Sequence, residues 1–329
     1  MRILEKLHTL FIILAVIIGL LLGQIPVIEV NAEQFIVPFL LLMLYGLFLG
    51  IPIKDLKKAF GNVKFAATSL TINFIWTPLL AWGLGAIFLF DQPALWVGFI
   101  MLMVTPCTDW YLVFTGIAKG NVSLSTAILP INLILQVLLL PVFLLLFAGV
   151  MKTVEMSFLI ESILLVLALP FLLANVTRFI FKNRQKVIEK KITPFFETGQ
   201  VIFLSLAIMA MFASQGRYLI ENINVVYMLL IPVFLFFLIN FMLGRFVSRL
   251  LKFSYEDSAS LNLTTLARNS PLSLAIAVVA FPDQPLIALA LVVGPLIELP
   301  LLAVTSQILL WIRKRGLIIK KEITRSSRK

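Results

Sequence analysis

The sequence predicts an all-α membrane protein that crosses the bilayer many times. Three observations lead to this fold class: 61% of the 329 residues are hydrophobic, only 13% are charged, and the mean hydropathy is +1.07. A soluble domain has about twice this share of charged residues and cannot bury so much apolar surface. The composition therefore excludes a soluble enzyme, a nucleic-acid-binding domain and a disordered chain.

Ten apolar segments are long enough to cross about 30 Å of hydrocarbon. We expect transmembrane helices at residues 10–28, 35–53, 65–89, 94–117, 122–149, 157–180, 198–215, 223–243, 257–281 and 284–312. Each half has five spans. Because five is an odd number, the second half of the chain enters the membrane from the side opposite to the first, which predicts two inverted five-helix repeats. We expect residues 1–181 to hold the first repeat and the sixth span, residues 157–315 the second repeat, and residues 316–329 a basic cytoplasmic tail. Residues 1–315 would act as one transmembrane domain.

The basic residues predict the orientation. If both termini are cytoplasmic, 24 of the 27 Lys and Arg residues lie in cytoplasmic segments, and Lys152 and Arg217 lie in the opposite loops. This asymmetry follows the positive-inside rule, and it accounts for the net charge of +11 without a nucleic acid as partner. We therefore expect a multi-pass protein of the bacterial cytoplasmic membrane whose basic tail contacts anionic lipid.

Away from the ends of the predicted spans, at mid-membrane depth, we single out three charged residues: Asp109, Arg268 and Glu298. An ionisable group at this depth costs at least about 2.5–3.5 kcal/mol and usually serves function. Asp109 and Arg268 occupy matching positions of the two halves, in the fourth and ninth spans. Pro106 and Pro271 lie beside them. We predict that both helices break there, that they cross, and that Asp109 pairs with Arg268; the alternative is two simple kinks with local hydrogen bonds.

Other polar residues in the spans allow more than one interpretation. Glu298, among apolar neighbours, is either a proton carrier or a structural group paired with an arginine. Asn132 and Gln136 share one face of the fifth span and either line a polar path or join helices by hydrogen bonds. With one cysteine, Cys107, and one histidine, His8, the chain has no internal disulfide and no thiolate or histidine metal cluster. No cofactor is expected, and there is no Walker A motif for ATP.

Several segments, in chain order, carry a resemblance to a known family: Asn73–Pro78, Phe88–Pro93, Cys107 with Ala118–Gly120, Asn132 with Gln136, Asn269 with Leu274–Ala277, and Val293–Pro300. Together they resemble the bile acid:sodium symporter superfamily and, within it, the Acr-type arsenite efflux permeases. The resemblance implies a core with crossed, discontinuous spans 4 and 9 that packs on a panel of spans 1, 2, 6 and 7. The chain departs from the arsenite branch at Pro106, where that branch has arginine, and in carrying Asp109 and Arg268.

The resemblance implies a secondary active transporter, not an enzyme. Arsenite at neutral pH is an uncharged trihydroxide that exchanges hydroxyl for thiolate, and a single thiol gives a bond weak enough for release. We therefore expect efflux of arsenite, and of antimonite as a further substrate, driven by proton antiport with alternating access. As(III) would bind transiently at Cys107, and the three intramembrane charges would carry the proton or form a charge pair. The expected substrate-binding residues are Cys107, Thr108, Asn132, Gln136, Asn269 and Ser270.

One alternative is a sodium- or proton-coupled symporter of an organic anion. Arg268 and the half-helix N-termini would then bind a carboxylate or sulfonate. The sodium-coupled branch resembles this chain at Lys119–Ser125, but where it places sodium-ligating Glu and Gln this chain has Thr264 and Arg268. At about 5 Å an arginine repels Na⁺ by several kcal/mol if the effective dielectric constant is about 20, so we expect proton coupling. A non-transporting receptor is a further alternative that the superfamily fold does not favour.

Overall fold

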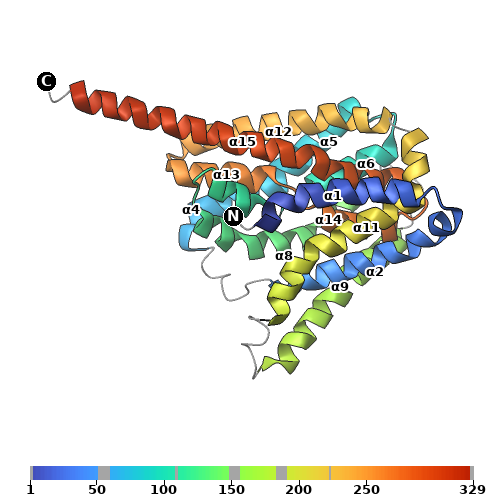
Figure 1. The fold of residues 1–329 in the computed structure, drawn as a ribbon. Coiled ribbons are helices and arrows are strands. Elements are labelled where there is room, and N and C mark those ends of the chain that lie inside the picture. Colours follow the sequence, from blue (N-terminus) through green and yellow to red (C-terminus); the bar gives the residue numbers. More distant parts are fainter. Residues whose placement is uncertain are drawn as a thin grey trace.

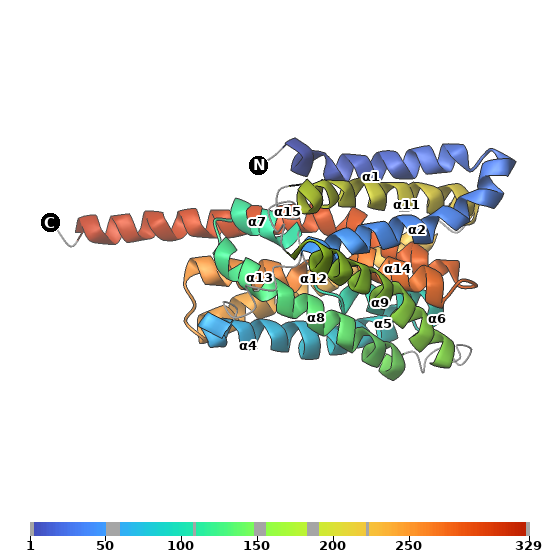
Figure 2. The same cartoon turned by 90° about the horizontal axis from the view of Figure 1, so that it is seen from below.

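The computed structural model describes residues 3–50, 60–107, 110–147, 156–182, 191–221 and 224–326. In these ranges the regular secondary structure is helical, and the β-type pairing is one isolated bridge between Pro106 and Arg268. The helices form one bundle in which α2, α9 and α11 are inclined to most of the others, and the C-terminal part of α15 projects beyond it (Figure 1). Both views place the start of α1 and the end of α15 toward the same end of the bundle (Figure 2).

The described elements follow one another with short connections. They are α1 (Ile3–Leu22), α2 (Pro26–Gly50), η2 (Phe60–Asn62), α4 (Val63–Thr71), the π-helical segment η3 (Ile72–Trp76), α5 (Thr77–Phe88), α6 (Pro93–Met103), α7 (Trp110–Ile117), α8 (Val122–Phe147), α9 (Met156–Ile180), α11 (Thr193–Glu221), α12 (Asn224–Leu250), α13 (Tyr255–Leu266), α14 (Ser270–Ala280) and α15 (Pro285–Ser326).

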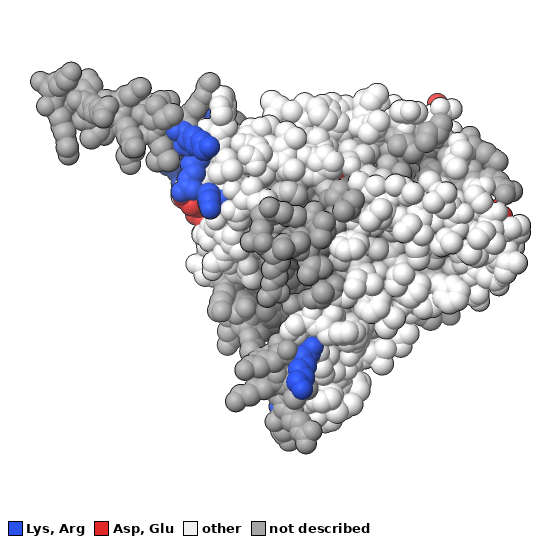
Figure 3. Space-filling model, viewed as in Figure 1, with Lys and Arg blue, Asp and Glu red and all other residues white. Residues whose placement is uncertain are grey.

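Much of the described chain can cross a membrane. Six helical stretches are long and apolar enough to do so: Pro26–Gly50, Val63–Phe88, Val122–Phe147, Thr193–Ser214, Tyr227–Leu250 and Pro285–Lys314. Shorter apolar helices lie at Ile13–Leu22, Pro93–Met103, Ala168–Ile180 and Ser270–Ala280. A broad uncharged surface covers the face seen in Figure 3, with basic side chains at its margins. The predicted all-helical, multi-pass membrane fold is confirmed at this level, while ten spans in two inverted repeats stay a prediction.

The expected spans and the observed helices differ most at the N-terminus. Each expected span overlaps one to three of the observed helical elements, but α1 ends at Leu22 and the chain turns before α2 begins at Pro26. Residues 26–28 therefore belong to the second helix and not to the first span. Proline fits the first turn of a helix, where its missing N–H has no intrahelical partner. At the other end, residues 316–326 of the expected tail continue α15 as helix.

Four helices pack together on one side of the bundle. α11 lies against both α1 and α2, and α2 also packs on α9 (Figure 2). They cover expected spans 1, 2, 6 and 7, the set that the family resemblance assigns to a panel. α14 contacts α2 and α9 of this group, so the ninth expected span lies where the group meets the rest of the bundle.

Two glycines allow α6 and α15 to approach closely. A Cβ atom added to Gly98 would lie 2.8 Å from the Cβ of Ala290, and one added to Gly294 would lie 2.6 Å from Cδ2 of Leu102. Larger residues would push α15 away from α6. Glu298 lies about one turn beyond Gly294, on the helix that this contact holds against α6.

Candidate functional site

Two interrupted helices cross at the centre of the described structure. One interruption separates α6 from α7, and the other separates α13 from α14. The backbone N–H of Asn269 donates to the carbonyl of Thr105 at 2.7 Å, and the N–H of Cys107 donates to the carbonyl of Ala267 at 2.9 Å. These bonds join the two interruptions as a short antiparallel bridge. Backbone groups that lose their helical partners at one interruption bond to backbone groups of the other interruption.

The two prolines take different places at this crossing. Pro106 lies within the first interruption and forms the bridge with Arg268. Pro271 lies in the first turn of α14, where a proline is tolerated, so it follows the second interruption. The side chain of Asn269 caps α14 by accepting from the N–H of Leu272 at 3.3 Å. The expected pair of breaks is thus present, but the capping asparagine and not the proline marks the start of α14.

Hydroxyl groups add a second link between the crossed helices. The Oγ atoms of Thr105 and Ser273 lie 3.0 Å apart, and the hydroxyl of Ser273 donates to the carbonyl of Met101 at 2.8 Å. Thr105 also donates to the carbonyl of Met101 at 3.0 Å. The end of α6 and the start of α14 are therefore connected by side chains as well as by backbone.

Arg268 places a cation at the crossing, and its side chain is 1% exposed. Its guanidinium donates to the carbonyls of Met103 at 2.9 Å and Leu266 at 3.1 Å. It also donates to Oδ1 of Asn73 at 3.2 Å and to the carbonyl of Thr265. The charge is therefore surrounded by four oxygens, three of them from backbone.

The helix ends explain why a cation is stable there. The last carbonyls of a helix have no intrahelical partner, and the helix dipole makes that end negative. Both α6 and α13 end beside the guanidinium, so one side chain satisfies carbonyls from two helices. The ring of Phe236 on α12 adds a cation–π contact, with its centroid 5.2 Å from Cζ of Arg268.

Glu298 connects α15 to the same crossing. Its carboxyl group is buried, and Oε1 accepts a hydrogen bond of 2.7 Å from the backbone N–H of Arg268. A carboxylate at Glu298 also lies near the buried guanidinium charge of Arg268. Through this contact, a change in the protonation of Glu298 would change the charge next to the second helix break.

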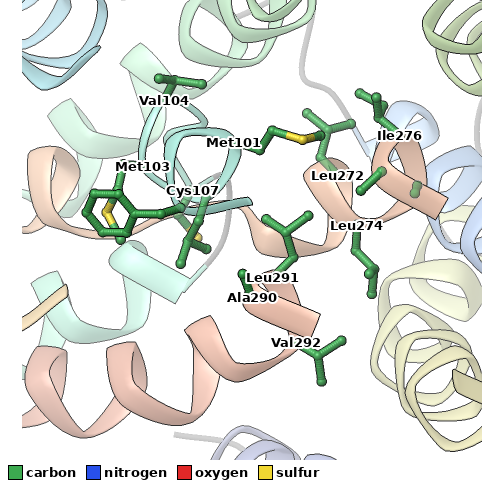
Figure 4. Packing of buried hydrophobic residues seen from close by; sticks show 14 of the residues in the cluster. Met101, Met103, Val104, Cys107, Leu272, Leu274, Ile276, Ala290, Leu291 and Val292 are labelled. Atoms are coloured by element: carbon green, nitrogen blue, oxygen red, sulfur yellow. The ribbon is translucent and has the colours of Figure 1, made fainter. Parts of the chain in front are cut away.

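Cys107 lies at the crossing in apolar surroundings. Its side chain is 1% exposed and belongs to a large hydrophobic cluster that includes Met103, Leu272 and Leu291 (Figure 4). Thr108 and Asp109 follow it and lie outside the described residues, so the predicted pairing of Asp109 with Arg268 stays a prediction.

The two side-chain amides of α8 are buried and have no hydrogen-bond partner among the residues that the structure describes. Asn132 and Gln136 are both 0% exposed, and neither amide oxygen nor amide nitrogen of either residue bonds to another described residue. α8 packs on α6, α7 and α13, which are helices of the crossing. The structure thus gathers Cys107, Arg268 and Glu298 at one point, together with Asn269 and its neighbour Ser270, and it places the α8 amides on a helix that borders this point.

Sequence reasoning missed two residues that hold Arg268, namely Asn73 and Phe236. Asn73 belongs to a segment that carries the family resemblance, but it is not among the predicted site residues. It lies in η3, where the π-helical turn changes the direction of the side chains, and such turns are frequent at functional sites. In the same segment, the indole N–H of Trp76 donates to Oδ1 of Asn240 at 2.9 Å. An amide within an apolar span was the available signal for both asparagines.

A helical membrane bundle with two broken helices crossing around polar and charged groups is the arrangement of a secondary transporter. The sequence comparisons agree with this class. Residues 37–222 match the model of the Sodium Bile acid symporter family, which is more than half of the chain. The chain belongs to this family and is a membrane transporter; the family's description and the relatives' names refer to transport and arsenical resistance, not to catalysis.

Three curated relatives show that the similarity extends over most of the chain. The arsenical-resistance protein Acr3 of Corynebacterium glutamicum is 27% identical over 94% of this chain and 89% of its own length. An uncharacterized transporter of Synechocystis sp. is 25% identical over 92% of this chain and 88% of its own. An uncharacterized sodium-dependent transporter of Bacillus subtilis is 25% identical over 81% of each.

Proposed function

We propose that this chain exports arsenite from the cytoplasm in exchange for protons. The observation that carries the proposal is the position of Cys107, whose backbone is held at the crossing of the two broken helices by the bond to Ala267. A soft sulfur ligand at a transporter's helix break is suited to As(III), which prefers thiolates. The name of the C. glutamicum relative, an arsenical-resistance protein, supports this choice of cargo.

The binding step is a ligand exchange that needs no oxidant or reductant. The thiol of Cys107 attacks arsenic trihydroxide, an S–As bond forms, one As–O bond breaks, and the thiol proton leaves with the hydroxyl as water. Water reverses the exchange on the other side of the membrane. In this proposal Thr108, Asn269 and Ser270 contact the remaining hydroxyls, together with the amides of Asn132 and Gln136.

Glu298 is the proposed proton carrier. Its carboxyl group accepts a bond from the N–H of Arg268, so protonation would remove a negative charge next to the cation at the second break. Proton binding from outside and arsenite binding from inside would then favour opposite-facing states, which is the requirement for exchange. Asp109 is a second proton carrier in this scheme.

The proposed topology is ten spans in two inverted repeats, with both termini in the cytoplasm of a bacterium. Support comes from the 24 Lys and Arg residues that this orientation places inside and from the position of both chain ends toward one end of the bundle. The broken pairs α6/α7 and α13/α14 would be the fourth members of the two repeats.

The test of the cargo is growth of an arsenite-sensitive bacterial strain that expresses this chain or Cys107→Ser. We expect resistance with the unchanged chain and its loss with the variant at equal membrane expression. Equal resistance from both proteins would reject Cys107 as the arsenite ligand. If resistance is absent from both while uptake of an organic anion occurs, the symporter alternative is correct.

The test of coupling is arsenite uptake into everted membrane vesicles that carry Glu298→Gln. Glutamine keeps an oxygen that accepts the bond from Arg268 but cannot carry a proton. We expect arsenite binding to remain and accumulation driven by a pH gradient to disappear. Unchanged accumulation would assign the proton to another group. Replacement of Na⁺ by choline in the same vesicles is expected to leave the unchanged protein's transport rate the same.

A further inference from the structure

Five buried side chains on α4, η3, α12 and α13 each have a polar atom with no hydrogen-bond partner among the described residues. These atoms are Oγ of Ser69, Nδ2 of Asn73, Nδ2 of Asn240, Oγ of Ser248 and Oδ1 of Asn262. All five residues are at most 3% exposed. α13 packs on both α4 and α12, and α12 also packs on α5, so the three stretches of chain adjoin one another. We call these five side chains the polar seam.

The middle of the polar seam lies where α12 and α13 approach most closely. Asn240, Gly244 and Ser248 follow one another at intervals of four residues, so they share one face of α12. A Cβ atom added to Gly244 would lie 2.7 Å from Oδ1 of Asn262. The amide of Asn262 therefore lies against the backbone of α12, between Asn240 and Ser248.

One end of the polar seam reaches the buried cation. Oδ1 of Asn73 accepts from the guanidinium of Arg268, which leaves Nδ2 of the same amide for another partner. Ser69 lies four residues earlier, on the same side of the helix. On α12, Phe236 lies one turn from Asn240 and places its ring against Arg268. Two helices thus carry seam residues next to the guanidinium.

The other end of the polar seam meets charged side chains. Arg245, which is partly exposed, donates to Oγ of Ser258 at 3.1 Å. The amino group of Lys64, which is exposed, donates to the carbonyl of Leu251. Ser248 lies within one turn of Leu251. Because exposed ammonium and guanidinium groups are hydrated, water is present at this end of the seam.

We propose that the polar seam binds a chain of ordered water molecules that extends from the charged end to Arg268. Buried polar groups almost always have a hydrogen-bond partner, and a buried water molecule supplies about three bonds to such groups. The seam offers both kinds of partner that water needs. The amide nitrogens of Asn73 and Asn240 donate, the amide oxygen of Asn262 accepts, and the two hydroxyls do both.

Arg268 determines what such a chain of water does. A guanidinium stays protonated in a protein, and its fixed charge repels hydronium and metal cations. The water therefore hydrates the buried cation from one side and does not carry protons through the crossing. Glu298, the proposed proton carrier, bonds to the backbone of Arg268 and not to its guanidinium. The proposal is therefore independent of the cargo and of the coupling ion.

The first experiment uses the direction of a change in the thermal unfolding midpoint of the purified full-length protein. Ser69→Ala and Ser248→Ala each remove a seam hydroxyl. If the hydroxyl bonds to water, its loss leaves that water short of a partner, and we expect a lower midpoint. The matched control is Ser205→Ala in α11, whose buried Oγ also lacks a described partner but lies outside the seam. Removal of an isolated unpartnered hydroxyl should leave the midpoint equal or higher.

The second experiment detects the water directly by pulsed hydroxyl-radical labelling with mass spectrometry. Radicals formed from bound water label the side chains next to it, even where these are buried. We expect label on Phe236, beside Arg268, and none on Phe99, which is as fully buried but on α6. Asn262→Leu interrupts the middle of the seam with a side chain of similar size, and it should reduce the label on Phe236.

Three results would overturn the proposal. Midpoints of Ser69→Ala and Ser248→Ala that match or exceed the midpoint of Ser205→Ala would mean that the seam is dry. Label on Phe236 that does not exceed the label on Phe99 would mean the same. A midpoint of the unchanged protein that rises with Na⁺ but not with choline, and loses this response in Asn262→Leu, would assign the seam to a metal cation instead of water.

Discussion

Two sets of buried polar side chains in this molecule differ in whether they have hydrogen-bond partners among the described residues. Arg268, at the helix crossing, has four oxygen acceptors and an aromatic ring around its guanidinium. Asn132 and Gln136, on α8, are equally buried, yet their four amide atoms bond to no described residue. Both sets lie in a part of the chain that is otherwise apolar.

We interpret this difference as one between a structural role for Arg268 and a proposed functional role for Asn132 and Gln136. A buried donor or acceptor without a partner costs about 1–3 kcal/mol, whereas one with partners is neutral or stabilising. The contacts of Arg268 therefore account for its presence through the stability of the crossing. Stability does not account for the amides of α8, and we propose that they serve to bind a ligand.

Glu298→Ala should have the largest effect on stability, because it leaves the N–H of Arg268 unbonded and a buried cation without its carboxylate. Loss of one partner of a buried pair costs about 3–5 kcal/mol. Thermal unfolding of the purified protein measures the change. Glu298→Gln is the control, since its amide oxygen still accepts the bond, and it should be destabilised clearly less. Equal midpoints for the two variants would show that the hydrogen bond to Arg268 contributes little.

Asn73→Leu comes next, because it removes an acceptor from a charged donor. Hydrogen bonds to charged groups contribute about 1.5–3 kcal/mol, against about 0.5–1.5 kcal/mol for neutral pairs. Asn240→Leu is the matched control, since Asn240 is also a buried amide whose oxygen accepts one bond, from the neutral indole of Trp76. If Asn240→Leu destabilises the protein as much as Asn73→Leu, Arg268 does not depend on Asn73.

The sequence predicted much of this arrangement but not how it is held together. Charges and prolines within apolar runs are visible in the sequence, and they led to the two breaks and to Arg268 and Glu298. The partners of Arg268 were not visible, because three of them are backbone carbonyls, which every residue has. The fourth, Asn73, lies 195 positions away, and no local pattern connects the two. The end of α1 was also missed, since the apolar run continues through the turn into α2.

Phe236→Leu should have a smaller effect that isolates the cation–π contact. Such contacts contribute about 0.5–2 kcal/mol, with the larger values at desolvated sites. Phe237→Leu is the control, because Phe237 is also buried on α12 and both rings share the same edge-to-face contact at 5.9 Å. Thermal unfolding should place Phe236→Leu below Phe237→Leu by the cation–π contribution. The reverse order would mean that the ring serves apolar packing alone.

The smallest expected change in stability belongs to the α8 pair, and it is the most informative about function. Asn132→Leu with Gln136→Met keeps side-chain size and removes four unpartnered polar atoms, so the unfolding midpoint should stay the same or rise. Arsenite transport should be lost if these amides contact the cargo. A lower midpoint would instead mean that the amides join helices through bonds formed in another state of the transport cycle. Unchanged stability with unchanged transport would remove both residues from the site and leave Cys107 and the helix breaks as its polar lining.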